Sequence, residues 1–383
     1  MTSRERVIAA INRTPQDRVP RYDAFWERTV ENFVRQGMRI PARRTLTVDG
    51  GLVKPVSSPA SDFFDFDMDF MYINTSMNFD IGVVGDDGGK YKIRDRYGWT
   101  AWRHKDGSGD MQFVSHMIGG REDWDRYKSR MVFNPKEPAR LDSESYFLHY
   151  SPYPSWKGAK QIYDALRSQG RYLAFACYGP YEGYWRLRGY TDALTDIILE
   201  PELTGDIMDA EIDLTIDTLQ YAIDNGMKPD GVFVAEDMGT ARAPLFSPKA
   251  YLDVIYPRHK RLGDFLRRNG IHFIMHSCGY VEPFIPHLID AGLDVLQALQ
   301  VSAGMDVLRL KRLYGDKLTF FGNIAASAFQ AGKEAVEKEI RDKIPTAMRG
   351  GGYIYHSDHS IPDDVSYETY LFAMKTLEEA GRY

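Results

Sequence analysis

Residues 272–279, with the sequence HFIMHSCG, place a histidine and a cysteine two positions apart at the end of a short apolar run. Such a run predicts a buried strand, in which side chains at positions i and i+2 point to the same side. His276 and Cys278 are therefore expected to face the same way and could bind one metal ion. A second apolar run, residues 352–355, leads into a pair of histidines that could supply a third ligand. Because zinc accepts nitrogen and sulfur ligands, the pattern predicts a zinc site.

The same residues allow a structural alternative. A lone His-x-Cys pair lacks the paired C-x-x-C spacing by which structural zinc sites are recognised. Cysteine is among the most buried residue types, so the pair could also be a core histidine beside a small buried thiol. The surrounding sequence has to decide between these two interpretations.

The second half of the chain repeats a strand–helix unit around this stretch. Short apolar runs predict strands at residues 172–177, 231–235, 272–276, 294–299, 318–322 and 352–355. Amphipathic segments predict helices at residues 192–199, 201–225, 248–268, 281–291, 305–313, 333–347 and 366–380. Two earlier strands are expected within residues 19–25 and 70–73. Such alternation implies a parallel sheet, and the chain length favours a closed (β/α)8 TIM barrel over an open doubly wound sheet.

The region between the early strands and the regular half has a different texture. Residues 85–89, with the sequence GDDGG, predict a turn between strand-like flanks, so we expect an inserted β-hairpin region at about 82–118, beside the barrel mouth. Several prolines within residues 134–155 predict a surface connection. Residues 1–383 are thus predicted to form a single barrel domain with one insertion.

Composition excludes several classes of protein. Of the 383 residues, 43% are hydrophobic, which is enough for a full core, and 48 basic residues against 54 acidic ones give a formal charge of −6 without a basic block. Nucleic acid is therefore not an expected partner. No apolar run approaches the ~18 residues that a membrane helix needs. Two cysteines and an N-terminus without an apolar targeting segment favour the cytoplasm.

Polar and aromatic side chains follow nearly every predicted strand of the second half. In a parallel barrel, active sites gather at the C-terminal ends of the strands, so these residues are expected to converge. In chain order they are Tyr178, Tyr181, Trp185, Glu236, Asp237, His276, Cys278, Gln297, Asn323, His356 and His359.

The stretch HSCGYV, residues 276–281, followed by residues 285–296, resembles the uroporphyrinogen decarboxylase superfamily. The likeness continues through residues 18–20, 65–69, 98–99, 236–239, 247–248, 315–323 and 361–365. It implies a (β/α)8 barrel that forms a homodimer. The superfamily holds two kinds of chemistry, which are cofactor-free decarboxylation of a porphyrinogen and zinc-dependent methyl transfer between a corrinoid and a thiol.

The resemblance is closer to the methyltransferases. The decarboxylases carry an Arg-Gln-Ala-Gly-Arg element that grips substrate carboxylates, whereas residues 21–28 read RYDAFWER here. A substrate with eight carboxylates needs such bidentate arginines, so uroporphyrinogen is not the expected substrate. The methyltransferases carry a His-x-Cys element and a late third zinc ligand, usually Cys, and His359 occupies the matching place in this chain.

The resemblance implies that zinc is held by His276, Cys278 and His359, with Glu236 as a candidate fourth ligand. Glu236 and Asp237 are adjacent at a strand end, so at most one of them faces the barrel centre. We expect Glu236 to be a zinc ligand or a general base, with helix capping or a salt bridge as the alternative. Asp237 is expected to be structural or to position the substrate, and it is a candidate catalytic residue together with Glu236.

Five residues are predicted to bind the substrate. Tyr178, Tyr181 and Trp185 would give an aromatic wall suited to a planar ring or a corrin face, although such a stripe also occurs where a helix packs. Asn323 and His356, which follow later strands, complete the set. His356 could alternatively support the metal site from behind or simply pack.

The leading interpretation is a zinc-dependent methyltransferase that moves a methyl group between a corrinoid and a thiol or related acceptor. The corrinoid would arrive on a separate corrinoid protein, because the chain lacks an Asp-x-His-x-x-Gly cobalamin-binding element. Two alternatives remain, which are a cofactor-independent decarboxylase or lyase acting on a smaller substrate and a non-catalytic module that binds a tetrapyrrole or corrinoid.

Overall fold

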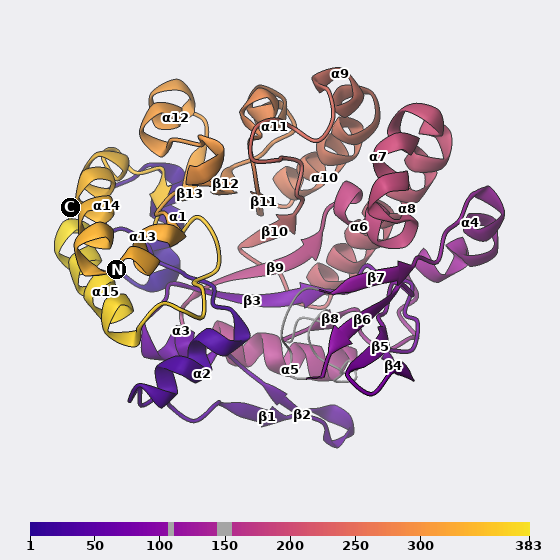
Figure 1. The fold of residues 1–383 in the computed structure, drawn as a ribbon, viewed down its shortest axis with the longest axis horizontal. Helices are drawn as coiled ribbons and strands as arrows, with labels where there is room; N and C mark the ends of the chain where they lie inside the picture. The colour runs from indigo at the N-terminus through magenta and orange to yellow at the C-terminus, as the bar shows by residue number, and fades with distance from the viewer. Residues whose placement is uncertain (106–110, 144–154) are drawn as a thin grey trace.

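The computed structural model describes residues 1–105, 111–143 and 155–383 (Figure 1). Residues 106–110, within the predicted hairpin region, and residues 144–154, within the predicted surface connection, lie outside the described residues.

A single eight-stranded sheet forms the centre of the molecule. Its strand order is β14-β13-β12-β11-β10-β9-β3-β8, and all neighbours are parallel except β8, which is antiparallel to β3. The strands are β3 (Met68–Ile73), β8 (Leu141–Asp142), β9 (Tyr172–Tyr178), β10 (Gly231–Ala235), β11 (His272–Ser277), β12 (Val295–Ala298), β13 (Thr319–Gly322) and β14 (Tyr353–Ile354). The six strands predicted in the second half are confirmed. The prediction succeeds because the strands of a parallel sheet are buried on both faces and therefore read as short apolar runs.

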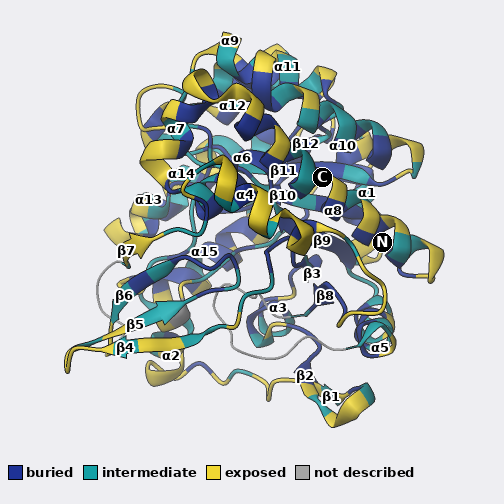
Figure 2. Cartoon of the chain, turned by 90° about the vertical axis from the view of Figure 1, so that its right-hand side faces the viewer, coloured by how far each residue is buried: buried dark blue, intermediate teal, exposed yellow. Residues whose placement is uncertain are grey.

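Helices surround this sheet (Figure 1). They are α1 (Ser3–Asn12), α2 (Glu27–Arg35), α3 (Pro59–Phe63), α4 (Arg121–Tyr127), α5 (Trp156–Arg167), α6 (Pro180–Arg188), α7 (Tyr190–Leu199), α8 (Pro201–Asp224), α9 (Pro248–Ala250), α10 (Tyr256–Arg268), α11 (Ile285–Asp290), α12 (Val307–Tyr314), α13 (Ala326–Ala331), α14 (Lys333–Ala347) and α15 (Tyr367–Ala380). Their outward faces carry exposed residues (Figure 2). Among the described residues, none of the helices is both long and apolar enough to cross a membrane.

One predicted helix is interrupted. The segment 248–268 forms α9, a π-helical turn at Tyr251–Ile255 and then α10. Pro257 lies in the first turn of α10 and has no N–H to donate to residue 253, which accounts for the break in the regular hydrogen-bond ladder.

Side chains alternate between two separate apolar cores. Ile274, Val295, Phe321 and Ile354 belong to the core enclosed by the strands, whereas their neighbours Phe273, Met275 and Phe320 belong to the core between the sheet and the helices. The first set therefore defines the interior face of each strand.

Helix α1 covers the N-terminal end of the strands. Val7, Ala10 and Ile11 belong to the interior core, and α1 contacts β3, β9 and β14. Arg6 fixes the helix through an ion pair of 2.7 Å with the buried Asp67, which directly precedes β3. The interior of the sheet is therefore reached from the C-terminal ends of the strands.

The prediction of a closed barrel of eight regular strands fails at residues 19–25, which do not form a regular strand. Residues 19–25 form isolated bridges on the β14 side, with Tyr355 N–H donating to Pro20 O at 2.8 Å and Tyr22 N–H donating to Tyr355 O at 3.1 Å. Towards β3, the only backbone hydrogen bond among the described residues is Asp67 N–H to Arg21 O at 2.9 Å. The far end of β3 pairs instead with β8, so residues 22–26 face β3 without a ladder. We call this interval, between residues 22–26 and β3, the seam.

The insertion is larger than a hairpin. Strands β4 (Gly82–Asp86), β5 (Lys90–Arg94), β6 (Thr100–His104) and β7 (Gln112–Ser115) form a four-stranded antiparallel sheet in sequential order. A small antiparallel pair, β1 (Thr45–Thr47) and β2 (Val53–Pro55), lies earlier in the chain. The assignment of residues 1–383 to one domain stays a prediction.

The buried ion pair between Lys54 of β2 and Asp142 of β8 provides a test of the fold. The ammonium lies 2.9 Å from the carboxylate, and the side chains are 1% and 2% exposed. Lys54→Met should lower the free energy of unfolding by about 3–5 kcal/mol, because the buried carboxylate loses its ammonium partner. Chemical denaturation measures this, with Lys338→Met as the control, since the Lys338–Asp342 pair is exposed and should contribute less than about 0.5 kcal/mol. A loss below 1 kcal/mol at Lys54 would contradict the assignment.

Candidate active site

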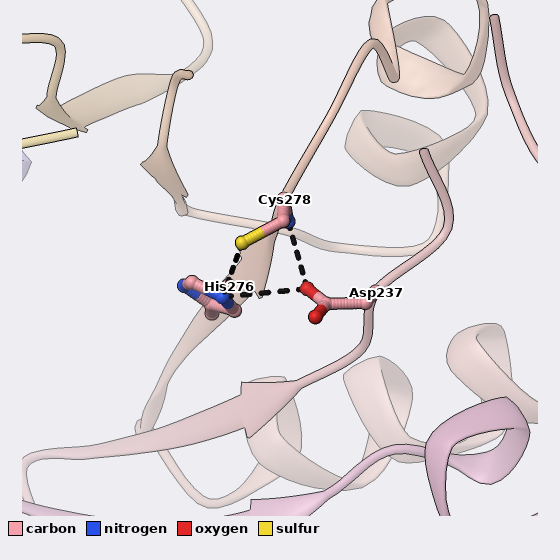
Figure 3. A group of neighbouring side chains, drawn as sticks. All are labelled: Asp237, His276 and Cys278. Atoms are coloured by element: carbon pink, nitrogen blue, oxygen red, sulfur yellow. Dashed lines mark hydrogen bonds and ion pairs between the residues drawn. The ribbon is translucent and has the colours of Figure 1, made fainter. Parts of the chain in front are cut away.

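Asp237, His276 and Cys278 meet at the C-terminal ends of β10 and β11 (Figure 3). The two strands are parallel neighbours, with Ala235 beside His276. Ile274 faces the interior, so His276 and Cys278 face it as well, as the i, i+2 spacing predicts. Asp237 has the same parity as Ala235 and therefore comes out beside them.

The donor atoms of these three residues are close together. They all lie within 4.8 Å of one another, and His276 Nε2 is 3.3 Å from both Cys278 Sγ and Asp237 Oδ1. Asp237 Oδ1 also accepts the backbone N–H of Cys278 at 2.8 Å. The Asp237 side chain is 46% exposed and that of His276 is 23% exposed, so the group is open to a ligand.

Two glycines hold the loops that carry the group against each other. A Cβ on Gly279 would lie 2.3 Å from the backbone of Gly239, and one on Gly239 would lie 2.7 Å from Cys278 O. Gly279 also has a φ of 78°, which favours glycine. Tyr280 N–H donates to Thr240 O at 2.8 Å across the same contact. The loops after β10 and β11 therefore fix Asp237 relative to Cys278.

The three groups stabilise one another's charged forms. Burial opposes ionisation of Asp237, but its contacts with His276 and Cys278 together outweigh burial and lower the carboxyl pKa to about 2. Burial likewise opposes protonation of His276 and ionisation of Cys278. Contacts with Asp237 and Cys278 nevertheless raise the pKa of His276, and contacts with His276 and His359 lower the pKa of the Cys278 thiol. The cysteine is thus prepared to act as a thiolate, the form that binds metals.

The donor set fits zinc. One thiolate, one imidazole and one carboxylate are all ordinary zinc ligands, and ligand atoms about 3.3–3.6 Å apart match the edges of a tetrahedral zinc site. The two distances of 3.3 Å from His276 Nε2 agree with this spacing. Zinc, if bound, would be held by Asp237, His276 and Cys278.

The two later histidines take different positions. His359 interacts with Cys278, which raises the histidine pKa, but it is not among the donor atoms that lie within 4.8 Å of one another, so its role as a zinc ligand stays a prediction. His356 is only 3% exposed, and burial lowers its pKa. The amide of Gln297 hydrogen-bonds His276 Nδ1 and lies 3.5 Å from the His356 ring nitrogens. His356 therefore lies next to Gln297, and its role, whether substrate binding, support of the site or packing, stays a prediction.

Glu236 does not join the group, and its predicted role as ligand or base is corrected by the structure. It is fully buried on the helix side of β10. Its carboxylate accepts the backbone N–H groups of Tyr181 and Glu182 at 3.0 and 2.9 Å and lies 3.0 Å from His259 Nε2. Glu236 therefore caps the N-terminus of α6. Asp237, one residue later, lies beside His276 and Cys278, in the position that was predicted for Glu236.

Two predicted substrate residues are structural. Asn323 is 1% exposed, donates to Leu299 O at 2.6 Å and accepts Val307 N–H at 3.1 Å, so it is occupied in holding the loop after β12. The ring of Tyr181 is fully buried between the sheet and the helices, 5.2 Å from Phe246. Neither side chain is available to a substrate.

The other two aromatic residues lie nearer the open end. Tyr178 is on the interior face of β9, and the guanidinium of Arg186 lies 3.9 Å from its ring centre. Trp185 packs edge-on against Phe113 of β7 at 5.9 Å. Their predicted contact with substrate stays a prediction.

Residues near the N-terminus complete the surroundings, and the sequence did not indicate them. Tyr22 stacks on His356 at 5.9 Å, and Trp26 lies 5.6 Å from His359. Asp23 accepts the N–H and hydroxyl of Ser357 at 2.7 and 2.8 Å. Residues 19–25 resemble any other apolar strand, so only their contact with residues 355–361 shows this role.

The fold and the site define an α/β protein of the TIM-barrel type with residues at the strand ends that could hold a metal ion. The profile of the family described as Uroporphyrinogen decarboxylase (URO-D) matches residues 165–380, which is more than half of the chain. The chain belongs to this family, whose members include decarboxylases and methyltransferases.

Two individual proteins extend the comparison. A uroporphyrinogen decarboxylase from Hahella chejuensis is 26% identical over 172 residues, which cover 44% of this chain and 46% of that protein, so the match spans about half of the relative. A methyltransferase from Methanosarcina mazei shares the fold over 99% of both chains, with a TM-score of 0.61 and 14% identity. Similarity at that identity establishes the fold alone.

Zinc binding should depend on one of the two cysteines. Cys278→Ser should weaken zinc affinity by more than about 100-fold, because serine is a poor zinc ligand. Loss of a residue that only hydrogen-bonds to a zinc ligand costs about 10–100-fold, and loss of the ligand itself should cost more. Metal analysis after dialysis against a competing chelator measures the effect. Cys177→Ser is the matched control, because Cys177 is buried on the helix side of β9, where burial raises its pKa. Equal zinc content in the two variants would remove Cys278 from the site.

Neighbouring carboxylates should give opposite phenotypes. Glu236→Gln should lower the free energy of unfolding by about 1–3 kcal/mol while zinc binding persists, because the amide cannot accept from every donor around it. Asp237→Asn should weaken zinc binding with little change in stability, since its side chain is half exposed. Denaturation and zinc titration of both variants decide the matter, and weakened zinc binding in a stable Glu236→Gln protein would restore Glu236 as a ligand.

Proposed function

We propose that this protein is a zinc-dependent methyltransferase that moves a methyl group between a corrinoid and a thiol. The observation that carries the proposal is the convergence of Asp237, His276 and Cys278 at the open end of the barrel. Such a group at the strand ends of a TIM barrel occupies the position where these folds place their catalysis.

The residues of the site divide the work between them. His276, Cys278 and Asp237 would hold zinc, with His359 approaching from the segment after β14. When bound, zinc lowers the pKa of a thiol acceptor and so supplies the thiolate at neutral pH. Gln297 orients the His276 ring through Nδ1, which leaves Nε2 directed at Cys278 and Asp237. One thiolate and one carboxylate balance the charge of the ion.

The geometry of the barrel suits a methyl donor carried by a second protein. Helix α1 covers the N-terminal end, so a corrinoid protein would approach the strand C-termini. His276 and Asp237 are partly exposed there. A large partner could therefore reach the thiol without displacing the core.

The arginines near the N-terminus argue against uroporphyrinogen as the substrate. Arg18 lies 2.7 Å from Asp67, and Arg21 lies 3.1 Å from Asp65. Both acids precede β3, at the end of the strands opposite Cys278. These guanidinium groups are therefore placed to stabilise the fold and not to bind substrate carboxylates.

Methyl transfer can be followed directly. Zinc-loaded protein with methylcobalamin and 2-mercaptoethanol should form the methyl thioether and cob(I)alamin, which is detected by its absorbance. Cys278→Ser should lose at least about 100-fold in rate, as removal of a group that stabilises the transition state does, and Cys177→Ser should keep the activity. Uroporphyrinogen is the control substrate. Turnover to coproporphyrinogen with no methyl transfer would make the protein a decarboxylase, and binding of corrinoid without either reaction would make it a carrier.

A further inference from the structure

A cavity of about 340 Å³ lies in the seam, separate from the metal-binding residues. Residues 22–26 form one wall, and Asp69, Phe70 and Tyr72 of β3 form the other. Residues 55–61, which connect β2 to α3, line it further. None of Asp237, His276 and Cys278 is among its described lining residues. Its volume is near the lower end of the range of about 300–1,000 Å³ for small-molecule sites.

The described lining of the seam cavity includes two carboxylates, Asp23 and Asp69, and one guanidinium, Arg43. Asp69 is 4% exposed, and its oxygens lie 3.4 Å from Arg171, whose closer partner at 2.8 Å is Asp62. Burial raises the pKa of Asp69 to about 6, as expected for a carboxylate with weak compensation. The one cation among the described lining residues, Arg43, is exposed to solvent.

The second carboxylate in the lining is already satisfied. Asp23 accepts three hydrogen bonds, two from Ser357 and one of 2.7 Å from the Tyr370 hydroxyl. Asp69 is thus the acid that a ligand would meet. Ser143 adds a buried hydroxyl that has no partner within the described residues.

Aromatic side chains also line the cavity. The lining includes Tyr22, Phe25, Trp26, Phe66, Phe70 and Tyr72. Ring faces attract ammonium groups, and a carboxylate next to several rings is the arrangement that selects substituted ammonium ions over neutral molecules. Arg171, at 3.4 Å, compensates Asp69 only weakly, so a cation would add to this compensation, whereas a neutral ligand would not and an anion would be repelled.

We propose that the seam cavity binds a small organic cation, with a substituted ammonium group held by the Asp69 carboxylate and the surrounding ring faces. The site needs no metal and does not depend on the proposed methyl transfer. It nevertheless adjoins the active site, because Tyr22 and Trp26 line the cavity and contact His356 and His359.

Calorimetric titration with three molecules of similar shape tests the proposal. Choline carries the cation, 3,3-dimethylbutan-1-ol is its neutral counterpart, and 3,3-dimethylbutanoate carries a negative charge. Choline should bind at least about tenfold more tightly than the alcohol, because the difference reports the cation–π and ionic contributions. The carboxylate should show no binding.

Variants assign the binding to this cavity. Asp69→Asn should reduce choline affinity to that of the alcohol and leave the alcohol unchanged. Asp294→Asn is the matched control, a half-buried acid near the N-terminal end of β12 that accepts Phe273 N–H at 2.8 Å. Trp26→Leu, at a half-exposed position that tolerates substitution, should also weaken choline binding if Asp69→Asn fails to fold.

Cys278→Ser separates this proposal from the proposed function. It should abolish zinc binding and keep choline binding. Tight binding of the alcohol or the carboxylate, unchanged choline affinity in Asp69→Asn, or no choline binding at tens of millimolar would each overturn the cation site, whatever the outcome of the methyl-transfer assay.

Discussion

The alternation of side chains along parallel strands that are buried on both faces is the constraint on which the rest of the structure depends. Each strand sends one set of side chains to the interior core and the other to the helices, and a shift of one residue would exchange them. Glu236 and Asp237 show how sharply this acts. They are covalent neighbours of the same charge, yet Glu236 caps the N-terminus of α6 and Asp237 joins the group that could hold a metal ion.

Much of this arrangement could be predicted from the sequence because it is local. Apolar runs locate the strands of the second half, and the i, i+2 spacing brings His276 and Cys278 together. Glu236 was misassigned because both faces of β10 are apolar, so hydrophobicity does not distinguish inside from outside. The pairing of Ala235 with His276 resolves the choice, and such a pairing exists only in the fold. The irregular course of residues 19–25 has a similar cause, since β8 occupies the far end of the β3 edge from a distant part of the chain.

The two carboxylates also differ in what their surroundings leave available. The Glu236 carboxylate is fully buried, accepts two backbone N–H groups and contacts His259 Nε2, which makes it a part of the scaffold. Asp237 shares one oxygen between Cys278 N–H and His276 and keeps nearly half of its side chain in contact with solvent. Asp237 has fewer hydrogen-bond partners than Glu236 and is therefore the carboxylate that can accept a ligand. Its loop is held in place by the contact between Gly239 and Gly279.

Helix α1 imposes a further consequence through its position under the strands. Val7, Ala10 and Ile11 cover the N-terminal end of the strands, so the C-terminal ends offer an entrance to His276. A corrinoid protein bound at the C-terminal ends of the strands would keep a small thiol that is already bound from leaving. It would also block the entry of a thiol that has not yet bound. The shape of the barrel, and not the relative affinities, would then require the thiol to bind before the corrinoid protein.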